Sequence, residues 1–304
     1  MPERMAFLFP GQGSQFVGMA GDLHDREPLA RERLHEANEI LGFDLAKLCL
    51  NGPAEALQLT VNAQPAILVH SVIVYELLRV RGIQPVAMAG HSIGEYSALV
   101  ASGCMSFADA VHMVHLRGRF MQEAVPVGVG AMAAILGLDS TQVELACVEA
   151  IDEGVVQPAN YNCPGQIVIS GHTAAVRRAM ARCLEHGAIK VVELPVSAPF
   201  HSALMAPAAE RLQPELHHVI FSDMQVPVIS NVEAKPLGSK VRVAKLLVDQ
   251  VTAPVRWQES MQALVHMGVD AVVEVGPGKV LSALMRRIDR QVRVVNLDDL
   301  LGAG

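Results

Sequence analysis

Paired cysteines are absent from this 304-residue sequence. The five cysteines lie far apart, at positions 49, 104, 147, 163 and 183. Their spacing matches neither a metal site nor a redox motif, and their number is odd. This scatter argues against a disulfide framework and predicts thiols buried in the core of a protein kept in a reducing cytoplasm.

A leader and a membrane-spanning run are also missing. The first four residues pass directly into the apolar stretch Met5–Phe9, without signal-peptide architecture. The longest apolar run, Pro65–Leu78, contains polar residues such as His70 and Glu76, so we expect it to be too short and too polar to span a bilayer. These features predict a cytoplasmic protein with no membrane partner.

The sequence has no nucleotide-binding signature and no excess of positive charge. The glycine-rich segment "FPGQGSQ" at 9–15 follows an apolar stretch, but it ends without Gly-Lys-Ser/Thr and does not read Gly-x-Gly-x-x-Gly. The net charge of −7 argues against general nucleic-acid binding. We expect neither ligand class.

What the sequence does contain is alternation of strand-like and helical segments. Hydrophobic residues make up 51% of the chain, and this alternation at both ends predicts a parallel sheet covered by helices. Between them, residues 130–194 follow the order β-α-β-β-α-β, which is typical of a ferredoxin-like unit. We therefore predict an α/β protein whose large, hydrolase-like subdomain (1–126 and 197–304) is interrupted by a small ferredoxin-like α+β subdomain (127–196).

One short segment has the form of a nucleophile elbow. In "AGHSIGEYSA", at 89–98, Ser92 lies between two glycines at the spacing Gly-x-Ser-x-Gly. An apolar stretch precedes it, and apolar residues at helical spacing follow it, as a strand–turn–helix elbow requires. Ser92 is thus a candidate nucleophile, and the backbone N–H after it a candidate half of an oxyanion hole. The loop 9–15 could supply the other half.

A serine nucleophile needs a base, and His201 is the candidate among twelve histidines. It lies in "PVSAPFHSALMAP", where the chain returns from the small subdomain to the large one, and such junctions favour sites. No Asp or Glu between Ser92 and His201 occupies an obvious position after a strand. A backbone carbonyl or an amide could orient the histidine instead. His91, next to the serine, is interpreted as supporting structure.

Arg117 falls on the apolar face of a predicted helix over 106–123. The same face carries Ala110, Met113, Val114, Phe120 and Met121, whereas Arg119 lies on the polar face. A buried guanidinium stays charged and needs a partner. The spacing leaves two interpretations open: an ion pair inside the protein, or a fork that binds a substrate carboxylate.

These motifs, in order over nearly the whole chain, resemble those of the malonyl-CoA:acyl carrier protein transacylases. The matching segments are "FPGQGSQ", "GHSIGEYSAL", "HLRGRFMQ", "ANYNCPGQIVISG", "VSAPFHSALM", "QVTAPVRW" and "VEVGPGKVLSAL".

The resemblance implies a role for each matching position. Ser92 would be the nucleophile and His201 the general acid/base, oriented by the backbone carbonyl of Gln250. The backbone N–H groups of Gln12 and Ile93 would form the oxyanion hole. Arg117 would hold the malonyl carboxylate, and Phe200 would stand where related enzymes select between malonyl and branched acyl groups. We expect no metal or other cofactor.

The implied activity moves a malonyl group from malonyl-CoA to the phosphopantetheine thiol of acyl carrier protein through a seryl acyl-enzyme, in fatty acid or polyketide synthesis. We expect a monomer that receives the acidic carrier on a basic surface, with Arg177, Arg178, Arg182 and Lys190 as one candidate cluster and Arg286, Arg287 and Arg290 as the other. Three alternatives share these motifs: the transacylase subunit of a malonate decarboxylase, a thioester hydrolase that edits carrier proteins, and an idle scaffold subunit.

Overall fold

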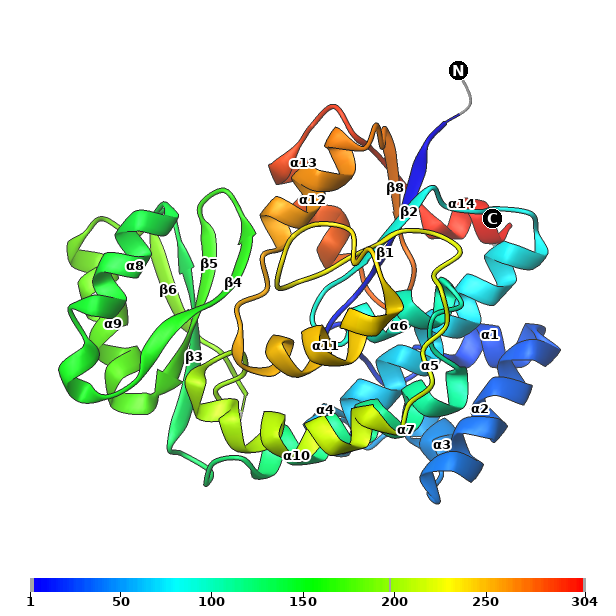
Figure 1. Cartoon of the computed structure of the whole chain (residues 1–304), viewed down its shortest axis with the longest axis horizontal. Helices are drawn as coiled ribbons and strands as arrows, with labels where there is room; N and C mark the ends of the chain where they lie inside the picture. The colour runs from blue at the N-terminus through cyan, green and yellow to red at the C-terminus, as the bar shows by residue number, and fades with distance from the viewer. Residues whose placement is uncertain (1–2, 197, 303–304) are drawn as a thin grey trace.

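Five parallel strands form one sheet in the computed structural model, which describes residues 3–196 and 198–302. The strand order is β7–β2–β1–β8–β9, so segments from both ends of the chain meet in the same sheet (Figure 1). The strands are β1 (Met5–Phe9), β2 (Ala87–Gly90), β7 (Val228–Ile229), β8 (Ala271–Glu274) and β9 (Arg293–Val295).

Helices from the same two parts of the chain surround this sheet. From the first part come α1 (Gly21–Arg26), α2 (Pro28–Leu41), α3 (Leu45–Asn51), α4 (Ala54–Gln58), α5 (Thr60–Val80), α6 (Gly94–Ala101) and α7 (Phe107–Glu123). From the second come α10 (Ala206–His217), α11 (Val243–Thr252), α12 (Trp257–His266), α13 (Val280–Ile288) and α14 (Leu297–Leu301), with short 3₁₀ turns at Ala203–Met205 and Lys240–Arg242.

Alternation along β1 divides the large subdomain into two cores. Phe7 and Phe9 point to one face of the sheet and pack in a cluster with residues of α2, α5, α6 and α7. Ala6 and Leu8 point to the other face and pack with residues of α12 and α13. Because successive side chains of a strand point to opposite faces, the sheet is buried between two helical layers.

The small subdomain is a four-stranded antiparallel sheet with two helices on one face. The strand order is β4–β5–β3–β6. Its elements are β3 (Gly130–Leu136), α8 (Ser140–Val148), a 3₁₀ turn at Ile151–Glu153, β4 (Val156–Cys163), β5 (Gln166–His172), α9 (Thr173–Glu185) and β6 (Lys190–Glu193). The order β-α-β-β-α-β and this strand arrangement are ferredoxin-like, so the predicted fold class is confirmed.

The two faces of the small sheet have different surroundings. Ala133 and Ile135 of β3 pack against α8 and α9, whereas Met132 and Val168 belong to the main core of the large subdomain. Backbone hydrogen bonds strengthen this junction: Tyr161 N–H donates to the Val255 carbonyl at 2.9 Å, and Val255 N–H to that of Ala159 at 2.8 Å. The small sheet is therefore attached directly to the segment after α11.

The predicted division of the chain at 127 and 196 stays a prediction. The elements of the small sheet run from Gly130 to Glu193, inside those limits. Residue 197, where the second part of the large subdomain was expected to begin, lies outside the described residues, as do residues 1, 2, 303 and 304.

Helix α5 contains a proline. It begins at Thr60, so Pro65 lies inside the helix. A proline at this position cannot donate to the carbonyl of Val61. Nδ1 of His115 lies 3.2 Å from that carbonyl oxygen and hydrogen-bonds it, so α7 supplies the missing donor.

The same helix corrects the expectation about membrane spans. Its 21 residues make it long and apolar enough to cross a bilayer by length and composition, so the run is not too short. However, 78% of its most apolar window is buried inside the protein, which is also what a central core helix would show. The five cysteines are free and buried, as expected from their spacing.

Candidate active site

Ser92 lies in a sharp turn between β2 and α6. Its φ of 53° is in the left-handed region, which is strained for a non-glycine residue. The two flanking glycines make the turn possible: a Cβ at Gly90 would lie 1.9 Å from the carbonyl carbon of Gly94, and one at Gly94 would lie 2.2 Å from the Phe9 oxygen. The Gly-x-Ser-x-Gly spacing therefore forms a strained elbow at the carboxyl end of the sheet.

His201 approaches this elbow from the loop after β6. Its Nε2 lies 2.8 Å from Oγ of Ser92. Its own φ is 56°, and Ala234 is the only other non-glycine residue with positive φ among the described residues. The two residues that form the serine–histidine contact are thus both held in strained backbone conformations, as often occurs at functional sites.

Two backbone carbonyls fix the tautomer of His201. Nδ1 lies 2.9 Å from the Gln250 oxygen and 3.1 Å from the Ala253 oxygen. Both oxygens only accept, so Nδ1 carries the proton, and in the neutral ring Nε2 accepts the hydrogen bond of the Ser92 hydroxyl. No carboxylate is needed to orient the ring, which explains why the sequence offers no obvious third acid.

The surroundings also keep His201 neutral. Burial, and then the positive charge of Arg117, lower the pKa of His201 to about 3. The imidazole is therefore unprotonated at neutral pH, as a general base must be.

Arg117 is 1% exposed and lies in the apolar face of α7, as the helical spacing predicted. Nη1 donates to Oε1 of Gln64 at 2.8 Å, and Nη2 donates to Oε1 of Gln250 at 3.0 Å and to Oγ of Ser92 at 3.2 Å. Nε has no partner among the described residues. Every partner of this buried cation is neutral, so the guanidinium can still bind a carboxylate beside the serine hydroxyl.

Gln12 and Ile93 lie on the same cavity as the serine. Within residues 3–196 and 198–302, neither backbone N–H donates to a protein acceptor, while the Gln12 side chain donates to Oγ1 of Thr60 at 3.2 Å. Two free N–H groups beside a nucleophile are what an oxyanion hole requires. The role of these two groups stays a prediction.

The cavity above Ser92 has a volume of about 430 Å³ and lies between the two subdomains. The large subdomain contributes Gln12, Arg117 and the elbow, and the small one contributes Met132 and Asn160. Phe200 also lines the cavity, and only 8% of it is exposed.

His91 supports the wall of this cavity. Its Nε2 hydrogen-bonds Oδ1 of Asn162 at 2.9 Å, and its ring lies 5.3 Å from that of Trp257, so it links the elbow to β4.

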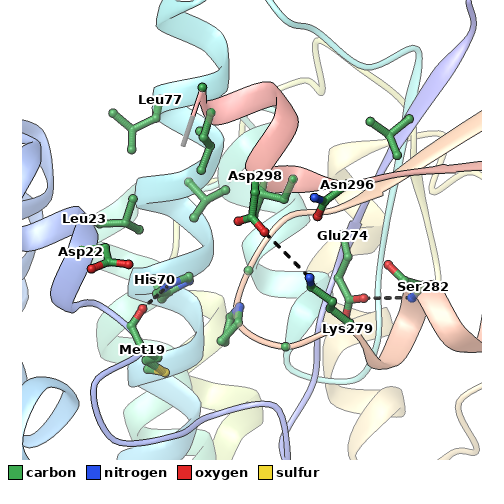
Figure 2. Close-up of a pocket in the computed structure, with 18 of the residues that line it drawn as sticks. Met19, Asp22, Leu23, His70, Leu77, Glu274, Lys279, Ser282, Asn296 and Asp298 are labelled. Atoms are coloured by element: carbon green, nitrogen blue, oxygen red, sulfur yellow. Dashed lines mark hydrogen bonds and ion pairs between the residues drawn. The ribbon is translucent and has the colours of Figure 1, made fainter. Parts of the chain in front are cut away.

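A second, larger cavity of about 630 Å³ is lined by Phe16 and Met19 of the loop 10–20 and by residues of α1, α5 and the C-terminal strands (Figure 2). Several of its polar groups have protein partners: His70 Nε2 contacts the Met19 carbonyl at 2.9 Å, Glu274 accepts from the Ser282 N–H at 2.8 Å, and Lys279 pairs with Asp298. Nδ1 of His70 has no partner among the described residues. No serine or cysteine there faces a base. The smaller cavity is therefore the candidate active site. Among the described residues no three His, Cys, Asp or Glu side chains cluster as a metal site would need.

Comparisons with known proteins identify the family. The family model for the acyl transferase domain matches residues 6–303. The chain belongs to this family. It is 48% identical to the malonyl CoA-acyl carrier protein transacylase of Bacillus subtilis (97% of this chain, 94% of the relative) and 49% identical to that of Escherichia coli K12 (94% and 93%).

Among solved structures, the chain resembles a malonyl-transacylase in complex with a type II PKS acyl-carrier protein. The TM-score is 0.96 at 41% identity, over 99% of this chain and all of that one. The resemblance inferred from the sequence motifs is thus confirmed, and this acyl transferase has its serine–histidine pair in the smaller of the two cavities.

Sequence analysis missed three residues that hold this site in place. Gln64 donates from Nε2 to Sδ of Met121 and holds Arg117 through its oxygen. Asn231 accepts the N–H of Ser92 at 2.7 Å, and Glu95 accepts the amide of Gln250 at 2.7 Å. The signal for Gln64 was a glutamine within an otherwise apolar helical run. Nothing in the local pattern marked Asn231, because its partner is 139 positions away.

Proposed function

We propose that this acyl transferase moves a malonyl group from malonyl-CoA to the phosphopantetheine thiol of acyl carrier protein through an ester on Ser92. The observation that carries the proposal is the 2.8 Å contact between Ser92 and a neutral, buried His201, with a buried arginine beside the same hydroxyl. The names of its relatives support the substrate and the carrier.

The first half-reaction forms the ester. Nε2 of His201 takes the hydroxyl proton of Ser92 as Oγ attacks the thioester carbonyl. The backbone N–H groups of Gln12 and Ile93 stabilise the oxyanion. When the tetrahedral intermediate collapses, the carbon–sulfur bond breaks and CoA leaves with the proton from Nε2.

The second half-reaction reverses these roles. The carrier thiol gives its proton to Nε2 and attacks the ester carbonyl, and Ser92 leaves with that proton. His201 begins and ends each half-reaction neutral, which agrees with its lowered pKa. The two carbonyl acceptors on Nδ1 stabilise the imidazolium that forms between the steps.

Arg117 supports malonyl as the acyl group. Its current partners are neutral oxygens, and a carboxylate replacing them would satisfy a charge that is otherwise expensive to bury. An acetyl group would leave the guanidinium as it is. This difference also argues against an editing hydrolase for neutral acyl chains.

Mass spectrometry tests the proposal. The protein is incubated with malonyl-CoA or acetyl-CoA, with and without phosphopantetheinylated acyl carrier protein. We expect a malonyl adduct on the enzyme that moves to the carrier. No adduct with either donor would refute the proposal, and release of free acid in place of transfer would indicate a hydrolase.

A further inference from the structure

Glu95, in the first turn of α6, is a buried carboxylate outside the cavity. It is 1% exposed and does not line the space above Ser92. Its Oε2 accepts the backbone N–H of Asn231 at 3.1 Å and Nε2 of Gln250 at 2.7 Å. In the described chain it forms no ion pair within 4.0 Å, so its negative charge is not matched by direct contact. A buried carboxylate among neutral groups is costly unless a cation lies near.

The nearest positive charge is on the far side of one amide. Nε2 of Gln250 donates to Glu95, and Oε1 of the same amide accepts from Nη2 of Arg117 at 3.0 Å. If the amide were reversed, its NH₂ would face the guanidinium and its oxygen would face the carboxylate. Both contacts would be repulsive. The two charges therefore fix the orientation of Gln250 between them.

Gln250 is also connected to both reacting residues. Its Nε2 donates to the Ser92 carbonyl at 3.1 Å, and its own backbone carbonyl accepts from Nδ1 of His201. Asn231 completes this layer by accepting the N–H of Ser92 and donating to the Gly90 carbonyl at 2.6 Å. A change at Glu95 is therefore transmitted to the site through side chains that do not line the cavity.

We propose that Glu95 is the buried counter-ion of Arg117 and acts on it through the side-chain amide of Gln250, as a positioning residue that limits how tightly a carboxylate-bearing acyl group binds. The Gln250 amide holds the negative charge of Glu95 close to Arg117, which stabilises the buried guanidinium. It also keeps the N–H groups of Arg117 out of direct contact with a protein carboxylate, so they can bind one from a substrate. A substrate carboxylate then brings a second negative charge to one cation. The inference rests on malonyl transfer as the proposed function.

Glu95 gains or loses its proton near neutral pH. Burial raises the pKa of Glu95 to about 7, against hydrogen bonds from Asn231 and Gln250 and the charge of Arg117, which lower it. A malonyl carboxylate at Arg117 would raise this pKa further. Binding of malonyl therefore takes up a proton when Glu95 is ionised, and binding of acetyl does not.

The other titratable groups around the elbow each favour one charge state near neutral pH. Arg117 stays charged. Burial raises the pKa of Tyr96, which favours the neutral phenol. Burial lowers the pKa of His91, and lowers that of His201 to about 3, which favours the neutral ring in both. A malonyl-specific proton uptake in this range is therefore assigned to Glu95.

The test measures dissociation constants in protein carrying Ser92→Ala, which binds acyl-CoA without reacting. With Glu95 present, we expect malonyl-CoA to bind about tenfold more weakly at pH 8 than at pH 6, relative to acetyl-CoA. With Glu95→Gln added, this difference should vanish and malonyl-CoA should bind about tenfold more tightly at pH 8. Both hydrogen bonds end on one oxygen, so glutamine can keep them while losing the charge.

Glu274→Gln is the control for removing a buried carboxylate elsewhere, because Glu274 is also buried but accepts one backbone N–H group of α13 on each of its two oxygens. It should leave both affinities and their pH dependence unchanged. If the ratio of the dissociation constants for malonyl-CoA and acetyl-CoA in Ser92→Ala protein does not change between pH 6 and pH 8, the inference is overturned. This result needs no Glu95→Gln variant, so it holds even if that variant fails to fold. If wild-type protein forms no malonyl adduct and the Ser92→Ala protein binds no malonyl-CoA, the proposed function fails instead.

Discussion

The larger and the smaller cavity described above contain similar groups and differ in how those groups are connected. Each has a buried histidine whose pKa is lowered by burial, to about 3 for His201 and to about 4 for His70. Each has a buried glutamate beside it in the fold, Glu95 or Glu274. The larger cavity, around His70, does not contain the serine–histidine pair.

The difference lies in what the polar atoms face. In the larger cavity, His70 hydrogen-bonds a backbone carbonyl and Glu274 satisfies two N–H groups at the start of α13. These contacts complete the fold. In the smaller cavity, His201 faces a hydroxyl, and a cation with neutral partners lies beside both. Backbone strain is also found here, at Ser92 and His201. Volume and buried titratable groups thus identify a site less well than a hydroxyl in contact with a histidine.

The largest expected effect comes from substituting Ser92 in the smaller cavity, compared with His70 in the larger one. Ser92→Ala should reduce labelling by malonyl-CoA by about 10⁵-fold, because only the attacking oxygen is lost. His70→Gln keeps a donor for the Met19 carbonyl and should leave the labelling rate unchanged. Single-turnover labelling of both variants is the measurement. Labelled Ser92→Ala protein would place the nucleophile elsewhere.

The charge of Arg117 should determine the preference for malonyl-CoA over acetyl-CoA. Arg117→Ala should lower kcat/KM for malonyl-CoA by about 10³-fold and affect acetyl-CoA far less, because the carboxylate loses its partner. Arg119→Ala, two residues further along α7 on its exposed side, is the matched control and should retain selectivity. An undiminished preference for malonyl in Arg117→Ala would mean that another group holds the carboxylate.

The pH dependence of acylation distinguishes His201 from an ordinary histidine base. Its lowered pKa predicts that kcat/KM does not fall between pH 7 and pH 5, where a base of pKa 6.5 would lose about 30-fold. Half-maximal activity near pH 6.5 would contradict the assignment.

The contribution of the two buried histidines to stability should fall with pH, unlike acylation, while protonation of Glu95 acts in the opposite direction. His70 and His201 both have folded pKa values below the unfolded one, so the unfolded chain takes up protons first as pH falls below about 6.5. Their contribution to the free energy of unfolding is then lost towards pH 4. Denaturant titrations at several pH values measure this loss.

Substitution of Phe200 should have a smaller effect, on which acyl group is accepted. Its ring lines the reactive cavity directly before His201, so Phe200→Ser should admit methylmalonyl-CoA with about a tenfold gain relative to malonyl-CoA. Phe16→Ser, on the larger cavity, should not change this ratio. Equal ratios in both variants would leave Phe200 as packing only.

The smallest expected effect concerns the carrier. On α9, Arg177 pairs with Glu193, and Arg182 with Glu149 and Glu185. Within the described residues, Arg178 of α9 and Arg286 of α13 form no ion pair and are free to meet an acidic partner. Arg286→Glu should therefore raise the KM for acyl carrier protein at low salt and less at high salt, with acylation by malonyl-CoA unchanged. Arg178→Glu is the control on α9. If Arg178→Glu has the larger effect, the carrier docks on the small subdomain.

Much of the fold could be predicted where the sequence pattern is local. The strand Met5–Phe9 coincides with an apolar stretch that has clear boundaries in the sequence. Helix α10 has no such clear pattern, since Pro207 and Pro214 obscure its apolar stripe. In α5, the carbonyl that Pro65 leaves without a donor is hydrogen-bonded by His115, a residue of another helix that no local pattern indicates.

The same distinction applies to the site. Ser92 and Arg117 could be found because an elbow motif and a helical face mark them. The motif resemblance named Gln250 for its backbone carbonyl, but the role of its side chain depends on Glu95 and Arg117, which the fold brings together from α6 and α7. Contacts between residues so far apart in the sequence leave no local signal.

Peptide mapping of the malonylated wild-type protein tests the central claim most directly. After brief reaction with malonyl-CoA, we expect one modified peptide, carrying the ester on Ser92, and its modification should disappear when phosphopantetheinylated acyl carrier protein is added. A malonyl group on any other residue, or an ester on Ser92 that the carrier thiol cannot remove, would contradict the assignment of the smaller cavity as the transfer site.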